Sequence, residues 1–347
     1  MNDPSIELAG PDEAAQALLD AERKVDNPYS CLVFVRAFEA QMLGELRHLI
    51  LRADGEVSGV LSYRARGSTL TVVNRLLELP PGVLASCVAR LFDANPNARR
   101  IVIDGLYDAG PSPNRATRGY PRRRWRGVEN FEVALPSTLD EYMSVFGSRT
   151  RKNLRYSERR FRREHPGADL VVLEGGDIDA ATVNAIVRLN HLRMESKGRE
   201  SGLDTQYARK LLTLCRAHGV ACIAREGGEV LAGTLCTRVG SGWCLHVIAH
   251  DPKLNHVRLG LVCLLRAVEA AIGSGATKFH FLWGDAPYKA LFGGRMRPLW
   301  THCYYRSHLH RLFAIRDVAT GLKQRLRRRL AQWNRKHRAP AAEPEPA

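Results

Sequence analysis

The sequence predicts an α/β protein of two tandem lobes, each with a mixed, mostly antiparallel sheet flanked by helices. The chain has 347 residues, more than one ordinary domain of about 150 residues needs. Hydrophobic residues make up 45% and charged residues 25%, proportions typical of a folded globular protein. An internal repeat is the third observation: residues 49–73 read LILRADGEVSGVLSYRARGSTLTVV, and residues 221–248 read ACIAREGGEVLAGTLCTRVGSGWCLHVI.

Each copy of the repeat predicts a three-stranded antiparallel meander. An apolar strand ends in Arg, a glycine turn follows, the tripeptide GEV opens a second strand, and a turn with Gly and Ser leads to a third. The first turns are Asp54-Gly55 and Gly227-Gly228, where glycine accepts the positive φ of a tight hairpin without steric cost. Both meanders are therefore specified by local turn chemistry.

A helix and a further strand follow each meander. Residues 82–92 and 259–272 carry apolar residues at helical spacing, and the apolar runs 100–106 and 278–284 come next. Because five elements recur in the same order, we expect two copies of one α/β unit. The predicted domains are a degenerate first lobe at residues 1–135, a second lobe at 136–312, and a basic, helical or disordered tail at 313–347.

The net charge of +16 is concentrated in three windows. Arg supplies 43 of the 52 cations, and most of the excess falls within residues 115–126, 149–163 and 323–338. The protein is therefore not uniformly basic, and these windows indicate surfaces that face a phosphorylated acceptor, an anionic membrane or RNA. In the third window Leu326, Leu330 and Trp333 lie along one side, which suits an interfacial helix on anionic lipid or a disordered basic tail.

The sequence indicates a cytoplasmic protein, with peripheral contact at the inner face of the cell membrane through the tail. The first residues lack the basic and apolar regions of a signal peptide, and Arg266 and Glu269 interrupt the longest apolar helix. Eight scattered cysteines without a C-x-x-C pair predict buried, reduced thiols. We predict no metal, because THCYYRSHLH at residues 301–310 has no standard zinc spacing.

Four segments carry a resemblance to a known family. They are SRTRKNLRYSERRFRRE (148–164), LNHLRMESKG (189–198), AHDPKLNHVRLG (249–260) and GDAPYKALFGG (284–294). The order of elements resembles the GNAT acyltransferase superfamily, and residues 148–294 are similar to the CelD/BcsL-type acetyltransferases within the FemAB-like tandem GNAT fold. The first half resembles the fold only. The resemblance implies that the fifth strand of the second lobe splays away from the fourth and opens a cleft.

The resemblance places an acyl-CoA, such as acetyl-CoA, as co-substrate at the loop that opens the helix 259–272. Helix N-termini attract phosphate through their unpaired N–H groups. The implied donor-binding residues are Asn255, His256, Val257, Arg258, Leu259, Gly260 and Leu261. The superfamily's usual phosphate pattern is not intact, because Asn255 stands first and Arg258 stands where Gly belongs. An ordinary strand-to-helix loop is the alternative.

The resemblance also implies catalytic residues near the segment 284–294. Tyr288 is a candidate general acid for the departing thiolate, Lys289 for stabilising an oxyanion or phosphate, and Asp285 for orienting the acceptor. His280 replaces an Asp common in the family and is a candidate base near neutral pH. Ala286 replaces a second acidic residue. A packed Tyr, a solvated Lys and a hydrogen-bonded core His are the structural alternatives.

A polar pair and a further histidine complete the candidate site. Val183, Val187, His191 and Glu195 recur at i,i+4 spacing, which predicts that His191 and Glu195 extend the apolar stripe of a helix to the edge of a cleft. A surface ion pair is the alternative. His246, on the strand before the donor loop, is another candidate for the cleft.

These observations favour an acyl-CoA-dependent N- or O-acyltransferase that transfers an acyl group, such as acetyl, to a saccharide or lipid-linked sugar in envelope or exopolysaccharide synthesis. One alternative is a FemAB-like transferase that uses aminoacyl-tRNA, although no extended coiled-coil pattern is visible. Another is a non-catalytic RNA- or membrane-binding protein on the same fold, which the two missing carboxylates favour.

Overall fold

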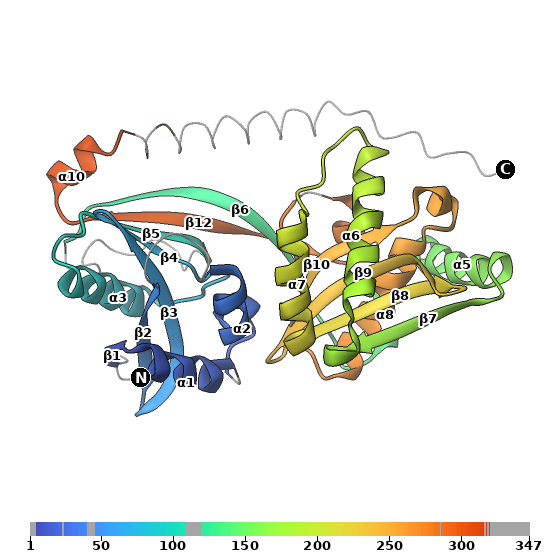
Figure 1. The fold of residues 1–347 in the computed structure, drawn as a ribbon, viewed down its shortest axis with the longest axis horizontal. Coiled ribbons are helices and arrows are strands. Elements are labelled where there is room, and N and C mark those ends of the chain that lie inside the picture. Colours follow the sequence, from blue (N-terminus) through green and yellow to red (C-terminus); the bar gives the residue numbers. More distant parts are fainter. Residues whose placement is uncertain are drawn as a thin grey trace.

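A computed structural model describes residues 5–22, 24–39, 46–107, 119–284, 286–315, 317 and 319. Its strands form one twelve-stranded sheet in the order β1-β2-β3-β4-β5-β12-β6-β11-β10-β9-β8-β7. Helices cover both halves of this sheet (Figure 1). The predicted α/β class with mostly antiparallel pairing is confirmed, and the strands of both predicted lobes join in this one sheet. Within the described residues, no helix combines the length and apolarity needed to cross a bilayer.

The first half of the chain forms the meander, helix and strand that the repeat predicts. β4 pairs antiparallel with β3 and parallel with β5, and Gly55 turns the first hairpin with φ +84°. The elements are β1 (Ser5–Ala9), α1 (Pro11–Glu22), η1 (Pro28–Ser30), α2 (Leu32–Phe34), η2 (Val35–Glu39), β2 (Leu46–Ala53), β3 (Glu56–Arg66), β4 (Thr69–Val72), α3 (Pro81–Ala94), β5 (Arg100–Tyr107) and β6 (Arg122–Ala134).

The second half repeats this order, with Gly228 at φ +85° in the equivalent turn. Its elements are α4 (Leu139–Ser144), α5 (Ser148–Glu164), β7 (Ala168–Glu174), η4 (Gly175–Asp177), α6 (Ala180–Glu195), α7 (Thr205–His218), β8 (Gly219–Glu226), β9 (Glu229–Val239), β10 (Gly242–His250), η5 (Pro252–Val257), α8 (Leu259–Gly273), β11 (Lys278–Leu282), α9 (Pro287–Leu291), β12 (Arg295–Tyr305) and α10 (His308–Phe313).

The two halves exchange strands at the centre of the sheet. β12, from the end of the second half, pairs with β5 and β6, while β6, from the end of the first half, pairs with β11. Strand pairing therefore continues across the predicted domain boundary near residue 135. That this boundary separates two folding units stays a prediction. The exchange brings side chains of β5 and β6 beside those of β11 and β12.

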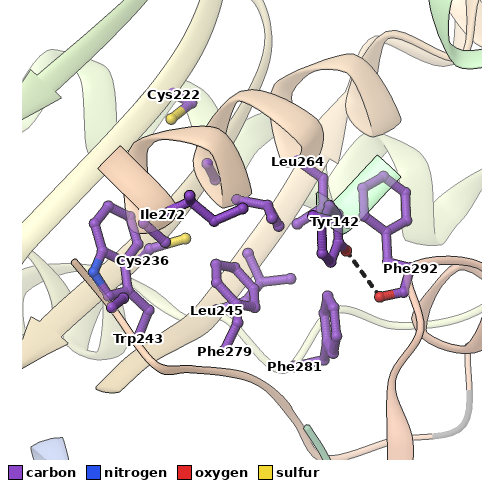
Figure 2. Close-up of a cluster of buried hydrophobic side chains, with 14 of the residues drawn as sticks. Tyr142, Cys222, Cys236, Trp243, Leu245, Leu264, Ile272, Phe279, Phe281 and Phe292 are labelled. Atoms are coloured by element: carbon purple, nitrogen blue, oxygen red, sulfur yellow. Dashed lines mark hydrogen bonds between the residues drawn. The ribbon is translucent and has the colours of Figure 1, made fainter. Parts of the chain in front are cut away.

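The largest buried cluster of the second half lies between the sheet and α8. Trp243, Phe279 and Phe281 pack there, and the Tyr142 hydroxyl donates to the Phe292 carbonyl at 2.9 Å (Figure 2). A separate cluster joins the halves, with Tyr29 against Leu282 and Leu214. All eight cysteines are free and buried, as predicted.

The basic windows have different structural settings. On α5, Leu154, Ser157 and Phe161 are buried on one face while cations occupy much of the rest. Arg122 to Arg126 belong to β6, whose residues 122–129 pair only with β12 among the described residues, so this part of the strand is a sheet edge. Charged side chains on an edge strand oppose pairing with other chains. The window 323–338 lies outside the described residues.

Candidate active site

β10 and β11 separate from each other after three residue pairs. They pair in parallel only from Gly242 to Cys244 and from Lys278 to His280. β10 then continues to His250, and its register with β9 shifts between Leu245 and Val247. A β-bulge of this kind bends a strand and increases its twist. The sheet is thus open between the two strands, as the resemblance implies, and His280 lies at the point of separation.

The predicted donor loop leads directly into α8. Arg258 adopts left-handed φ 55° and ψ 37°, and no side chain caps the helix. Val257, Leu259 and Gly260 are buried, whereas Asn255, His256 and Arg258 are exposed and Leu261 is half-buried. Buried residues therefore anchor the loop, while exposed polar residues and the helix N-terminus face solvent. This arrangement can hold a phosphate through backbone N–H groups and the helix dipole.

Two histidines tie the loop to its neighbours. His250 Nε2 lies 2.7 Å from Asn255 Oδ1, and burial lowers the pKa of His250 below its ordinary value. His256 Nε2 lies 3.1 Å from Glu164 Oε2 at the end of α5. Asn255 and His256 thus have structural contacts of their own, and Lys253 and Arg258 are exposed cations of this loop, with Arg258 next to the first turn of α8.

Tyr288 lies beside a cation that the sequence analysis did not select. Burial raises the pKa of Tyr288 to about 12, and Arg193 on α6 opposes this shift. The Arg193 guanidinium also donates to the Ile248 carbonyl of β10 at 3.4 Å. Tyr288 is therefore protonated at neutral pH, and burial makes it a weak acid, an effect that the charge of Arg193 partly offsets. Arg193 belongs to the LNHLRMESKG segment (189–198). The family resemblance of this segment was the sequence signal that could have identified Arg193 as a candidate site residue.

His280 takes part in a buried polar network. Its side chain is 5% exposed, and Nδ1 lies 3.3 Å from Glu132 Oε2 and 2.9 Å from Asn130 Nδ2. The Tyr107 hydroxyl donates to Glu132 at 2.8 Å, and Arg297 Nη1 donates to it at 2.9 Å. Only His280 was predicted, because its partners come from β5, β6 and β12.

The charge of Glu132 is fixed by these contacts. Burial raises the pKa of this carboxyl, but hydrogen bonds from His280, Arg297 and Tyr107 together lower it to about 2. Glu132 is therefore an anion at neutral pH. A carboxylate beside a ring nitrogen selects the histidine tautomer and stabilises the imidazolium.

Lys289 is buried rather than solvated, with 2% of its surface exposed. Its ammonium donates to the Leu282 carbonyl at 2.9 Å and the Trp283 carbonyl at 2.6 Å. Leu282 has φ 54°, a left-handed conformation that costs a bulky residue on the order of 1–3 kcal/mol. Lys289 therefore holds the strained end of β11, two residues after His280.

The remaining predicted residues are not among the hydrogen-bond partners found in this network, or lie outside the described residues. His191 and Glu195 are exposed, and His191 Nε2 lies 2.6 Å from the Leu203 carbonyl, so the expected extension of the apolar stripe is not seen. His246 lies at the β10 bulge, 2.9 Å from Thr237 Oγ1, and burial lowers its pKa to about 4. Asp285 lies outside the described residues.

Comparisons with known proteins agree with this fold. Residues 148–290 match the family model described as an acetyltransferase (GNAT) domain. The chain contains a GNAT acetyltransferase domain. The protein is therefore an acyltransferase. No curated protein matches the sequence.

Solved structures resemble the whole chain in fold. FemX has a TM-score of 0.64 at 11% identity, covering 89% of this chain and 99% of FemX. The C-terminal domain of a protein described as a lysylphosphatidylglycerol synthetase, from Agrobacterium fabrum, has a TM-score of 0.56 at 12% identity, covering 89% and 96%. L-PGS from Bacillus licheniformis has a TM-score of 0.52 at 15% identity, covering 88% and 97%.

A cavity of about 460 Å³ adjoins the His280 side of the GNAT domain. The first half of the chain supplies most of its lining, which combines apolar walls with polar groups at several points. Its lining residues from the second half are Lys278 and His280, and those from the first half include Asp26, Asn27, Leu51, Val60, Leu76, Glu78 and Tyr107. This size falls within the range of about 300–1,000 Å³ for small-molecule sites.

One group of side chains in the described residues could hold a metal ion. Glu22, Cys31 and His218 each place a ligand atom within 4.8 Å of the others. Glu22 Oε1 already accepts from the Leu32 N–H at 2.6 Å, and burial raises the pKa of the Cys31 thiol to about 12. We therefore assign no metal to this group, and none of its members lines the cavity at His280.

Replacing Gly260 by Val should weaken binding of an acyl-CoA. A Cβ at this position would lie 2.9 Å from His250 Nδ1, so the first turn of α8 or the His250 ring would have to move. We expect at least about a tenfold loss of affinity, or about 1.4 kcal/mol, in calorimetric titration with acetyl-CoA.

Gly273→Ala is the matched control for this prediction. It lies at the other end of α8, where an added Cβ meets nothing within 4 Å. Its affinity for acetyl-CoA should equal that of the unmodified protein. Equal affinity for Gly260→Val as well would show that the α8 N-terminus does not hold the donor.

Proposed function

We propose that the protein transfers an acyl group, such as acetyl, from an acyl-CoA to an amine or hydroxyl of a saccharide or lipid-linked saccharide in envelope or exopolysaccharide synthesis. The observation that carries the proposal is the opening between β10 and β11. The uncapped N-terminus of α8 lies at one end of this opening, and the His280–Glu132 pair lies where the strands separate. Donor and acceptor can therefore approach a common point.

In the proposed reaction, His280 is the general base. In the reactive tautomer the His280 proton is on Nδ1 and is directed to Glu132, while the two Asn130 amide hydrogens are donated to Tyr107 and Glu132. Nε2 is then free to accept a proton from the acceptor amine or hydroxyl. The acceptor attacks the thioester carbonyl carbon, and the carbon–sulfur bond breaks. Tyr288 supplies a proton to the departing thiolate, while Lys289 fixes the end of β11 that carries His280.

The cavity beside His280 is the proposed acceptor site. Its apolar walls suit the less polar face of a sugar or a lipid portion, and Asp26, Glu78 and Lys278 can hydrogen-bond hydroxyl or amine groups. The predicted contact between the basic tail and an anionic membrane stays a prediction, because the tail lies outside the described residues.

Calorimetric titration with acetyl-CoA and CoA tests the donor. We expect micromolar binding by the unmodified protein and at least about a tenfold weaker affinity for Arg258→Ala, because the loop would lose the exposed cation next to the α8 N-terminus. Arg209→Ala, an exposed cation on α7, is the matched control and should bind normally. Absence of binding by any CoA ester would contradict the proposal.

A second candidate donor is aminoacyl-tRNA. The observation that favours it is the whole-chain likeness to FemX, which is greater by TM-score than the other two likenesses described above. Transfer of a radiolabelled amino acid from charged tRNA, without affinity for CoA esters, would support this reading. Steeply salt-dependent RNA binding with no transfer would instead favour a non-catalytic protein.

A further inference from the structure

A second pocket, of about 530 Å³, lies between the start of β6 and α10. Arg122 and Arg124 line it from β6, and His308 and Arg311 line it from α10, together with residues 119–121. No carboxylate is among the described residues that line it. Three guanidinium groups around one cavity form a surface suited to a phosphate, which arginine can bind through two parallel hydrogen bonds.

The strand register explains why two of these arginines share one side of the sheet. Arg122 is opposite Tyr304 and Arg124 is opposite His302 on β12, so both project from the same face. The Arg124 guanidinium lies 4.9 Å from the Trp300 ring centre, which stabilises it as a cation.

The positive field of this cluster reaches the protein interior. The pKa of His302 is lowered to about 3, first by burial and then by Arg122 and Arg124. His302 is 5% exposed and its Nε2 has no hydrogen-bond partner. An anion in the pocket would offset this field.

α10 presents an apolar surface beside the pocket. His308 and Arg311 are three residues apart on one side of the helix and line the cavity, and Leu312 lies next to them, four residues after His308. Leu309, Leu312 and Phe313 on α10 are 59%, 66% and 74% exposed, and Ile315, two residues after the helix, is 72% exposed. Side chains this large and apolar are rarely exposed together on a soluble surface without a binding role. α10 lies at the end of the β6–β12 pair remote from the second lobe (Figure 1).

We propose that this pocket binds the phosphate of an anionic phospholipid while the exposed apolar residues of α10 enter the adjoining membrane surface. Cations beside large apolar side chains are the composition of an interfacial element. A zwitterionic headgroup would bring its own cation toward three arginines, so the charge pattern favours a headgroup whose only charge is the phosphate. Protection of a sheet edge would explain the charged residues between Arg122 and Arg126 on β6. It does not explain the exposed apolar residues of α10.

Vesicle co-sedimentation with the full chain tests the proposal. The vesicles contain phosphatidylcholine alone or an equimolar mixture with phosphatidylglycerol. We expect binding to the mixture only. The double variants Arg124→Gln/Arg311→Gln and Leu312→Ser/Phe313→Ser should each lower the partition coefficient by about tenfold or more. The control Arg155→Gln/Arg159→Gln removes the same charge from exposed positions on α5 and should bind as the unmodified chain does.

Several outcomes would overturn the proposal. If the α5 control lost as much vesicle binding as the pocket variant, the electrostatic attraction to the membrane would be diffuse rather than located at the pocket. If neither the pocket variant nor the α10 variant lost vesicle binding, other segments of the chain would bind the membrane. Stabilisation by inorganic phosphate without vesicle binding would identify a site for a free phosphate instead. A change from dimer to monomer in the Leu312→Ser/Phe313→Ser variant, without vesicle binding by the unmodified chain, would identify an interface between copies. Because no readout uses acyl transfer, the result is independent of the proposed function.

Discussion

Replacing His280 by Gln should lower the turnover of acyl transfer by about 100- to 10,000-fold, the usual contribution of a general base. Gln can keep a hydrogen bond to Asn130 or Glu132 but cannot accept a proton at neutral pH. Acetyl-CoA affinity should be unchanged, because the α8 N-terminus is a separate part of the site. The measurement is thiol release from acetyl-CoA in the presence of an acceptor, together with calorimetric titration of the donor.

His165→Gln is the matched control for this variant. His165 is a histidine of the same lobe that lies 2.8 Å from a carboxylate, Glu226, at the end of α5. Its replacement should leave turnover unchanged. If His280→Gln retained full turnover while remaining folded, His280 would be a structural core histidine and the proposed mechanism would fail.

Replacing Glu132 by Gln should destabilise the fold and remove part of its dependence on pH. The side chain is 11% exposed and receives hydrogen bonds from Arg297 and Tyr107, so losing its charge should cost about 1.5–3 kcal/mol of unfolding free energy. Because the folded pKa of Glu132, about 2, lies below its ordinary value of 4.5, this stability is present above about pH 4.5 and is lost as pH falls toward 2. Urea denaturation between neutral and acidic pH measures both effects.

Glu129→Gln provides the comparison on the same strand. Glu129 pairs with Arg126 at 3.3 Å, but both side chains are more exposed, so this change should cost at most about 1 kcal/mol. The Glu132 variant should also lose turnover, since His280 would lose the anion that stabilises its imidazolium. A Glu132 variant whose stability curve is parallel to that of the unmodified protein from neutral to acidic pH would contradict the pKa of about 2.

The helix α6 illustrates a limit of reading a site from spacing. Steps of four residues rotate about 40° beyond each full turn of a helix, so an i,i+4 series drifts around the axis. His191 and Glu195 therefore reach solvent, whereas Arg193, from the same segment, reaches β10. The family-like segment contains the side chain that reaches β10, but the packing of the helix decided which of its residues that is.

The sequence by itself determined the repeated unit and the position of the loop that opens α8. Both follow from local physics: glycine turns close the hairpins, and helical or alternating apolar patterns specify the elements between them. The same patterns placed His280 at the end of a buried strand. They also predicted buried thiols, which the structure confirms for all eight cysteines.

Only the tertiary structure decided which side chains surround His280. Glu132, Tyr107 and Arg297 are far from it in sequence and become its neighbours because β6 and β12 exchange between the halves of the sheet. The sequence alone allowed Lys289 to be a solvated side chain. It is buried instead, because its ammonium donates hydrogen bonds to two carbonyls at the strained end of β11. Pairing between distant strands depends on contacts across the whole fold, and no local pattern encodes it.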